Sequence, residues 1–234
     1  MRLLLTMILP FLVSTPALAE SWRTLAPGID YQRFTNGTGQ AFRLDLRTVR
    51  LGIAIGSPVA KVETLARGTS SVLATNGSFF TPAGQSLGLL IDQGQEKNPL
   101  RQADWGVLTV TRNGRARLVH TRDYESRRDT DFAMQVGPRL VVRGRTLRFP
   151  LQMARRTAVG VLDDPHKLVL VVSEGALTTT RLAELMKSTF HAQFALNLDG
   201  GSSSQVWSNL PGVRSFQADR VANALIVRHR DGAP

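Results

Sequence analysis

The chain has 234 residues and contains no cysteine. This excludes disulfide bonds, thiolate metal sites and a lipid anchor attached to a cysteine. Histidine is also scarce, and the four positions, 120, 166, 191 and 229, lie far apart without the spacing of a helical pair. A zinc site built from histidines is therefore not expected. Without covalent cross-links the fold has to rest on its apolar core, for which a hydrophobic fraction of 42% is sufficient.

Long apolar runs are missing except at the N-terminus. Residues 1–19 combine Arg2, an apolar stretch over residues 3–13 and the small residues Ala17 and Ala19, which is the pattern of a secretory signal peptide. We expect the mature chain to begin at Glu20 and residues 20–234 to form one domain. The apolar stretch is short for a membrane-spanning helix, and no other segment approaches that length. The sequence therefore predicts an exported protein, periplasmic or secreted, without stable membrane insertion after signal cleavage.

Lysine is rare as well, and the net charge of +11 comes from 25 arginines against 4 lysines. Such an excess favours anionic partners. The arginines are spread along the chain instead of being clustered on one helix among aromatic residues, so a nucleic-acid partner is not expected. Nothing in the sequence indicates an oligomeric state.

Alternating apolar and polar residues predict a protein made mostly of strands. Strands are expected near residues 42–47, 51–55, 72–75, 87–92, 106–111, 116–120, 139–143, 157–162, 167–173 and 222–227. Asn113-Gly114 predicts a hairpin turn between two of them. The apolar spacing over residues 180–191, after a run of threonines that can cap it, predicts one clear helix, and residues 59–67 a weaker one. The expected fold is α+β: a single domain with a mixed, mostly antiparallel β-sheet and a few helices packed on it.

The most informative segment is residues 195–204, Ala-Leu-Asn-Leu-Asp-Gly-Gly-Ser-Ser-Ser. An apolar run stops there at Asp199, followed by Gly200, Gly201 and three serines. Asn197 and Asp199 would point to the same side of a strand, because side chains alternate faces, and the glycines would allow backbone amides to approach a ligand. The alternative interpretation is a strand that ends in an ordinary Asp-Gly turn.

Four other segments also set polar groups beside glycine at the ends of apolar runs: residues 75–80, 134–142, 155–161 and 172–175. In this order the segments resemble the motifs of the phosphodiester glycosidase family over roughly residues 70–228. The matching motifs are Asn-Gly-Ser-Phe-Phe at 76–80, Gln-Val-Gly-Pro-Arg-Leu-Val at 135–141, Arg-Thr-Ala-Val-Gly at 156–160 and Leu-Asp-Gly-Gly-Ser-Ser-Ser at 198–204. The chain is most similar to the short, signal-bearing bacterial members that consist of this domain and little else.

The resemblance implies a hydrolase that cleaves a glycosyl-1-phosphodiester at the anomeric carbon, so the partner would be a small molecule or glycan carrying phosphate. Arg156 is suited to bind a pair of phosphate oxygens, with Gly200 and Gly201 supplying amide donors. Asp199 is the first candidate for the catalytic carboxylate and Glu174 the second. The other expected substrate-binding residues are Asn76, Gly77, Gln135, Asn197, Ser202 and Ser203. Ser78 departs from the family, because many relatives have glycine there, and its hydroxyl would alter substrate choice beside the site.

Each of these residues also has a structural alternative. Arg156 could form an ordinary ion pair, Asn76 could cap a turn, and Gln135 could satisfy buried backbone groups. Asp199 could brace the glycine turn or hold a cation. The sequence therefore predicts no definite cofactor, and a bound divalent cation is an alternative that it leaves open.

An acyl-transfer enzyme and a binding module are the two alternatives to this hydrolase. An acyl-transfer serine after Gly201 lacks the Gly-x-Ser-x-Gly elbow, since Gln-Val-Trp at 205–207 continues as a strand instead of a helix. A non-catalytic exported module that binds anionic glycans or cell-envelope polymers through its arginines remains an alternative to the glycosidase.

Overall fold

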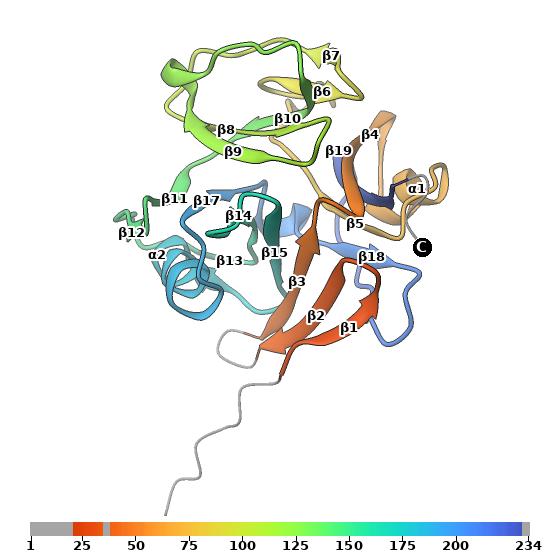
Figure 1. Ribbon diagram of the computed structural model, residues 1–234, viewed down its shortest axis with the longest axis vertical. Coiled ribbons are helices and arrows are strands. Elements are labelled where there is room, and N and C mark those ends of the chain that lie inside the picture. Colours follow the sequence, from red (N-terminus) through yellow and green to blue (C-terminus); the bar gives the residue numbers. More distant parts are fainter. Residues whose placement is uncertain (1–20, 35–37, 231–234) are drawn as a thin grey trace, which may run out of the picture.

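Antiparallel strands dominate the computed structural model, which describes residues 21–34 and 38–230 (Figure 1). Strands contain 48% of the residues and helices only 11%, so the fold fits the expected α+β class only loosely. Within the described ranges every pair of strands is antiparallel, and the sheets are not mixed. The expected signal peptide at residues 1–19 lies outside the described residues.

The largest sheet has eight strands in the order β1-β2-β3-β15-β14-β17-β11-β12. Its strands are β1 (Arg23–Ala26), β2 (Ile29–Phe34), β3 (Gly39–Asp45), β15 (Lys167–Ser173), β14 (Thr157–Val161), β17 (Phe194–Asn197), β11 (Arg139–Val142) and β12 (Arg145–Thr146). The sequence order is interrupted between β3 and β15, so the sheet joins the N-terminal strands to strands from residues 139–197.

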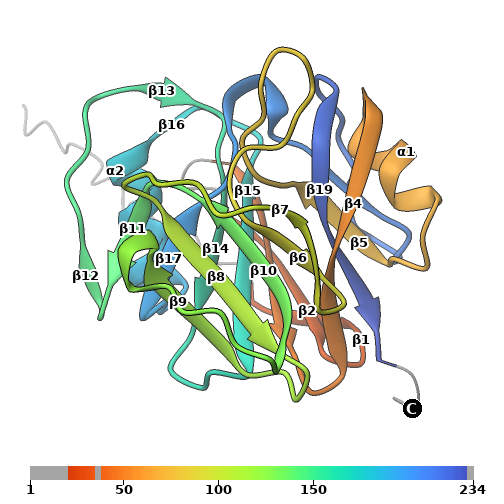
Figure 2. The same ribbon diagram turned by 90° about the horizontal axis from the view of Figure 1, so that it is seen from above.

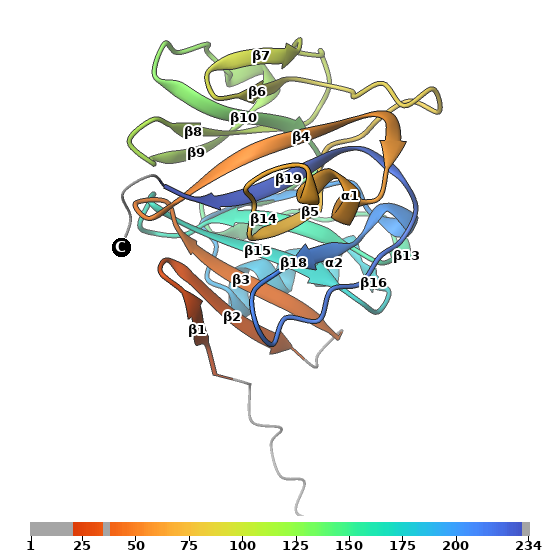
Figure 3. The same cartoon turned by 90° about the vertical axis from the view of Figure 1, so that its right-hand side faces the viewer.

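Two smaller sheets pack beside it, as Figures 1 and 3 show. The five-stranded sheet contains β7 (Gln95–Asn98), β6 (Leu90–Asp92), β10 (Thr130–Val136), β8 (Gly106–Thr111) and β9 (Ala116–His120), in that order. The four-stranded sheet contains β18 (Val206–Ser208), β5 (Leu73–Asn76), β19 (Val221–His229) and β4 (Val49–Ala60). A short ribbon pairs β13 (Met153–Ala154) with β16 (Leu177–Thr178).

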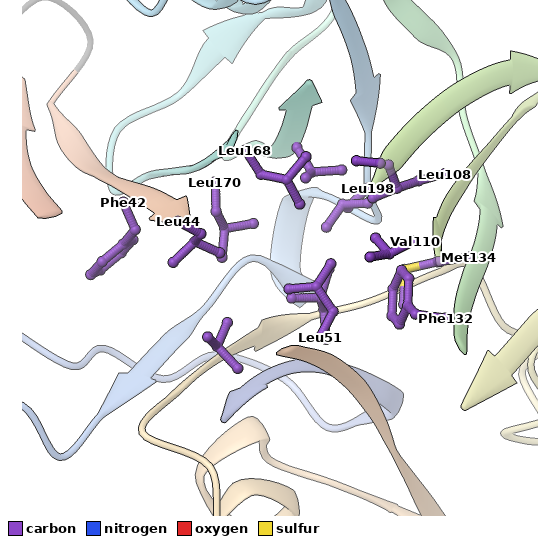
Figure 4. Close-up of a cluster of buried hydrophobic side chains, with 14 of the residues drawn as sticks. Phe42, Leu44, Leu51, Leu108, Val110, Phe132, Met134, Leu168, Leu170 and Leu198 are labelled. Atoms are coloured by element: carbon purple, nitrogen blue, oxygen red, sulfur yellow. The ribbon is translucent and has the colours of Figure 1, made fainter. Parts of the chain in front are cut away.

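The three larger sheets share one apolar core. Figure 4 shows Phe42, Leu44, Leu168 and Leu170 of the eight-stranded sheet facing residues of the other two sheets, which include Leu51, Leu108, Val110, Phe132 and Met134. Burying these side chains together is the main source of stability, at about 25 cal/mol per Å² of apolar surface. One continuous core that involves all three sheets is consistent with the single domain that the sequence predicts.

Strand β15 shows why some strands read as continuous apolar runs. Leu168, Leu170 and Val172 enter the central core, whereas Val169 and Val171 belong to a second cluster on the opposite face of the sheet. Helix α2 (Thr179–Glu184), continued by a π-helical turn (Leu185–Thr189), contributes to that second cluster. Both faces of β15 are therefore covered, and simple alternation is lost.

The helices agree with the expected positions. Helix α2 begins after Thr178, whose side chain accepts a hydrogen bond from the Arg181 N–H at 3.0 Å. Helix α1 (Val62–Arg67) packs on the four-stranded sheet. No helix in residues 21–34 and 38–230 is both long and apolar enough to cross a bilayer.

Most expected strands form, and the hairpin at Asn113-Gly114 joins β8 to β9. Strands β1, β2, β7 and β10 and the two-residue strands β12, β13 and β16 were not expected. Strand β10 is buried throughout but contains Asp131 and Gln135, which break the apolar pattern. Asp131 is neutralised by Arg50 of the neighbouring sheet at 2.9 Å, a contact that no local pattern predicts.

Candidate active site

A cleft of about 390 Å³ opens where three neighbouring strands of the eight-stranded sheet begin or end. Strand β17 ends at Asn197, opposite Ala158 near the start of β14, and β11 begins just after Pro138. The cleft is lined by Phe79, Gly137, Pro138, Phe149, Pro150, Gln152, Ala154, Arg156, Thr179, Asn197, Asp199, Gly200 and Gly201. It therefore brings together Arg156, Asn197, Asp199 and the glycine turn, as the sequence predicts.

A larger groove, of about 860 Å³, lies elsewhere, between β9 and the strands β11, β14 and β17. Four arginines, Arg115, Arg117, Arg139 and Arg143, line it together with apolar side chains. Of the family motifs it includes only Arg139, from the segment at 135–141, and none of the residues expected above to act in catalysis or substrate binding. Size alone does not decide the active site, and the smaller cleft is preferred because the candidate chemical groups converge there.

Arg156 is the distinctive charge of the cleft. Its side chain is only 7% exposed, and its Nε and one terminal nitrogen donate to the carbonyl oxygens of Leu177 (3.3 Å) and Gln152 (2.6 Å). No carboxylate among the described residues forms an ion pair with it. Burial lowers the pKa of this guanidinium below its ordinary value. A buried cation held by carbonyl oxygens alone favours an anion at the cleft.

Asp199 lies on the same cleft, just beyond the end of β17. Burial raises the pKa of its carboxyl group, and hydrogen bonds from the Ser203 hydroxyl and the Gly200 N–H act in the opposite direction. The backbone of Asp199 is fixed from β5, because its N–H donates to the carbonyl oxygen of Gly77 at 3.0 Å. Asp199 is the only carboxylate that lines the cleft in the part of the chain described here.

The glycine turn differs from expectation. The Gly200 N–H donates to the Asp199 carboxylate at 2.9 Å, and the Gly201 N–H donates to the Arg155 carbonyl oxygen at 2.8 Å. Both amides are therefore occupied within the chain and are not presented as phosphate donors. Gly201 has a φ of +64°, and a Cβ there would meet no atom within 4 Å. The turn orients Asp199 and keeps the cleft open beside it.

Asn76 and Gly77 support the site from behind. The buried Asn76 side chain donates to the Asp199 carbonyl oxygen at 2.5 Å and accepts from the Thr157 hydroxyl at 2.8 Å and the Gln205 N–H at 3.3 Å. At Gly77 a Cβ would lie 2.1 Å from the Asn223 side-chain oxygen, so no larger residue fits. Neither residue lines the cleft. Their contacts are those of structural residues that support the Asp199 turn, and not those of substrate-binding residues.

Ser78 also turns away from the cleft. It is 1% exposed, and both its N–H (2.7 Å) and its hydroxyl (3.3 Å) donate to the Asn223 side-chain oxygen. Its hydroxyl stabilises the loop and Ser78 does not line the cleft, contrary to the expectation from the family resemblance.

Asn197 is the last residue of β17 and lines the cleft. Its side-chain nitrogen donates to the carbonyl oxygens of Gly137 (3.2 Å) and Leu198 (2.5 Å). Its side-chain oxygen is buried without a hydrogen-bond partner, although Asn197 lines the cleft. An acceptor in this situation is suited to a ligand hydroxyl or N–H.

Gln135 and Glu174, two further expected site residues, also do not line the cleft. All the hydrogen bonds of the Gln135 side chain are internal: its oxygen accepts from the backbone N–H groups of Leu89 and Arg101, and its nitrogen donates to Arg101 and Thr121. Glu174 forms an ion pair with Arg33 at 3.3 Å and accepts from Gln40 at 3.0 Å. The structure thus leaves Asp199, not Glu174, as the carboxylate at the cleft.

The matching region of the sequence decides the family. Residues 69–228 match the sequence profile of the phosphodiester glycosidase family. The chain belongs to this family.

Solved structures share its fold. The catalytic domain of zebrafish N-acetylglucosamine-1-phosphodiester alpha-N-acetylglucosaminidase, auto-inhibited by its pro-peptide, has a TM-score of 0.72 at 18% identity, and the match covers 91% of this chain and 87% of that one. A hypothetical protein from Synechocystis has a TM-score of 0.64 at 17% identity, covering 93% of this chain and 64% of that one. No curated protein matches the sequence.

The family motifs contribute to the cleft in different ways. The segments at 156–160 and 198–204 supply Arg156, Asp199, Gly200 and Gly201, whereas the segment at 76–80 supplies the supporting Asn76. Ser203 is 93% buried beside Asp199, and Ser202 is exposed outside the cleft lining. The chain continues from Ser204 into β18, which agrees with the rejection of a serine nucleophile at a strand-to-helix elbow.

Several cleft residues were missed by sequence reasoning. Phe149, Pro150 and Gln152 come from the irregular segment between β12 and β13, and Thr179 begins α2. An irregular segment has no periodicity, so only the distance in space assigns these residues to the site. Phe79 had a signal, because it belongs to the motif at 76–80; its ring packs against Trp105 with centroids 5.1 Å apart.

The described ranges contain no group of three or more His, Cys, Asp or Glu side chains placed to hold a metal ion.

Proposed function

We propose that this chain hydrolyses a glycosyl-1-phosphodiester. The phosphate would lie against Arg156, and the sugar would place its anomeric carbon near Asp199. Membership of the phosphodiester glycosidase family supports this reaction class. The observation that carries the proposal for this chain is the pairing, on one cleft, of a buried arginine without a carboxylate partner among the described residues and a single, partly buried carboxylate.

A single carboxylate fits a phosphate leaving group. A glycosidase that expels an alcohol needs a second carboxyl group as general acid, because an alkoxide leaves poorly. Here the C1–O bond would break with its electron pair going to a phosphate monoester, whose second pKa is about 6, so no strong acid is required. Water would add its hydroxyl to the anomeric carbon and release a proton.

The two charges would have separate tasks. Arg156 would neutralise the phosphate in the substrate and in the product, and its burial strengthens that interaction. Asp199 would stabilise the positive charge that develops at the anomeric carbon, or accept the proton of the attacking water. The raised pKa makes this carboxylate a better base than an exposed one. The unpartnered Asn197 oxygen would accept a hydrogen bond from a sugar hydroxyl or amide.

The test is release of free sugar from a panel of glycosyl-1-phosphodiesters, including N-acetylglucosamine linked to phosphate. Asp199→Asn should lower turnover by about 10² to 10⁴-fold without loss of the fold. Glu174→Gln is the matched control, because its carboxylate lies in an ion pair outside the cleft, and it should retain turnover. Equal activity of wild type and Asp199→Asn would contradict the assignment.

Arg156 can be tested separately. Arg156→Lys keeps a positive charge but loses the planar fork that binds two oxygens. We expect a higher KM for the phosphodiester and weaker inhibition by inorganic phosphate. Unchanged inhibition by phosphate in this variant would place the anion elsewhere.

One observation favours a second function, binding of anionic glycans without catalysis. The groove of about 860 Å³ is lined by Arg115, Arg117, Arg139 and Arg143, and is far larger than the cleft. This function predicts salt-sensitive binding to anionic glycans that Arg115→Gln combined with Arg117→Gln abolishes, together with no turnover on any member of the panel.

A further inference from the structure

The segment that forms the outer wall of the cleft has an unusual composition. Residues 132–162 contain six arginines and no aspartate or glutamate. Within them, residues 145–155 connect β12 through β13 toward β14; we name these residues the rim loop. Figure 2 shows this segment running along the outer edge of the molecule, with β13 at its far end.

The rim loop carries most of the large apolar side chains that the fold leaves in water. In the described residues four such side chains are exposed, and three of them belong to this loop: Leu147 (38%), Leu151 (91%) and Met153 (64%). The fourth, Ile55 (48%), is in β4 of the four-stranded sheet. Soluble proteins seldom gather exposed apolar residues on one segment without a partner.

The same loop is positively charged without compensation. Arg145 and Arg148 are exposed, Arg155 is partly exposed, and none of the three forms an ion pair with a described carboxylate. A partner of the loop therefore has to offer negative charge close to apolar surface. An anionic lipid bilayer has this combination, with charged headgroups directly above hydrocarbon.

The loop is also continuous with the cleft. Phe149, Pro150, Gln152 and Ala154 line the cleft, whereas Leu151 and Met153, between them in sequence, are exposed. Arg156 fixes the loop through its hydrogen bond to the Gln152 carbonyl oxygen at 2.6 Å. Leu151 and Met153 in a bilayer would therefore bring the mouth of the cleft to the level of the lipid phosphates.

We infer that the rim loop docks the cleft on an anionic lipid surface through Leu151 and Met153, with Arg145 and Arg148 on the headgroups. Given the proposed function, on which this step rests, the substrate class is a sugar joined through a phosphodiester to a membrane lipid. The lipid would stay in the bilayer as a phosphate monoester, and the sugar would be released to water.

Binding of the protein to membranes can be tested without measuring enzymatic activity. The mature protein is sedimented with vesicles of phosphatidylcholine containing about one third phosphatidylglycerol, and with vesicles of phosphatidylcholine alone. We expect binding to the anionic vesicles that weakens as salt is raised. Leu151→Ser combined with Met153→Ser should lower the partition coefficient at least about tenfold, and Arg145→Gln combined with Arg148→Gln about 25-fold. These side chains are exposed, so the variants should fold normally.

Two controls separate the loop from general surface properties. Ile55→Ser removes an exposed apolar side chain from another sheet, and Arg127→Gln combined with Arg128→Gln removes two exposed arginines that precede β10. The partition coefficients of both control variants should lie within about twofold of the wild-type value, once salt screens the long-range attraction between protein and membrane charges. No binding to anionic vesicles at low salt, or equal losses in controls and loop variants, would overturn the inference. The inference would also be overturned by a dimer, detected by light scattering, that dissociates in the Leu151→Ser, Met153→Ser variant while vesicle binding stays unaltered.

A second measurement concerns the substrate class. Turnover is compared between a sugar phosphodiester with a lipid aglycone in anionic vesicles and the same sugar phosphodiester with a methyl aglycone in solution. The Leu151→Ser, Met153→Ser variant should lose activity only on the lipid substrate. Equal activity of this variant and wild type on both would overturn the substrate class, whereas absence of turnover on both substrates in wild type would refute the proposed function and leave the vesicle result standing.

Discussion

Asn76 provides the sharpest test of the site's construction, because two roles for it predict different measurements. Its side chain is fully buried and makes three hydrogen bonds, to Asp199, Thr157 and Gln205. Asn76→Ala removes all three and leaves buried groups unpaired. At about 1 kcal/mol for each bond, the free energy of unfolding should fall by about 3 kcal/mol.

The assay is thermal unfolding followed by circular dichroism. For a chain of this size each kcal/mol corresponds to about 2–4 °C, so the Tm of Asn76→Ala should fall by about 6–12 °C. Thr157→Val removes one of the three bonds and also the contact of the Thr157 hydroxyl with the Ser204 hydroxyl at 3.3 Å, so its Tm should fall by about two thirds as much. Turnover by the folded fraction should also fall, because the Asp199 turn loses its support.

The opposite result would refute this reasoning. If Asn76 bound substrate directly, Asn76→Ala would raise KM while Tm stayed within about 1 °C of wild type. Exposed Asn209, replaced by alanine, is the matched control for both measurements and should change neither.

Other predictions follow from burial and charge. Because burial raises the pKa of Asp199, the favourable contribution of its neutral form is present at low pH and is lost as pH rises through the raised pKa, so Asp199→Asn should unfold at the same or a higher temperature than wild type at pH 7. A lower Tm would contradict this. Arg50→Ala leaves the buried Asp131 unpaired and should lower the free energy of unfolding, measured in urea, by about 3–5 kcal/mol. Arg67→Ala, which breaks an exposed ion pair, should lower it by less than about 1 kcal/mol. N-terminal sequencing of protein recovered from the periplasm or medium should begin at Glu20; an uncleaved N-terminus would reject export by this signal.

The expected secondary structure held where the pattern was local. The Asn113-Gly114 hairpin and the Thr178 cap depend on neighbouring residues, and both form. Strand β10 was missed because its polar residues, Asp131 and Gln135, are satisfied by distant partners. A local pattern cannot distinguish a buried polar residue with a remote partner from an exposed one.

The residues of the candidate site also fall into those that the sequence predicted and those that it did not. The abrupt change from an apolar strand to polar groups indicated Asp199 and the glycine turn, and the resemblance to the family motifs indicated Arg156. The sequence could not tell that the amides of Gly200 and Gly201 are already occupied, or that Glu174 is neutralised by Arg33. These facts depend on hydrogen bonds between segments far apart in the chain.

The sequence by itself determined the family, the predominance of strands and the residues that end β17, because motifs and periodicity are properties of neighbouring residues. Only the tertiary structure decided which polar groups remain free. Asn76 and Gln135 form their side-chain hydrogen bonds inside the fold, while Arg156 lines the cleft and the buried Asn197 oxygen has no hydrogen-bond partner among the described residues. The physical reason is that a polar group's availability is set by all the partners within hydrogen-bonding distance, and the folded chain alone determines those distances.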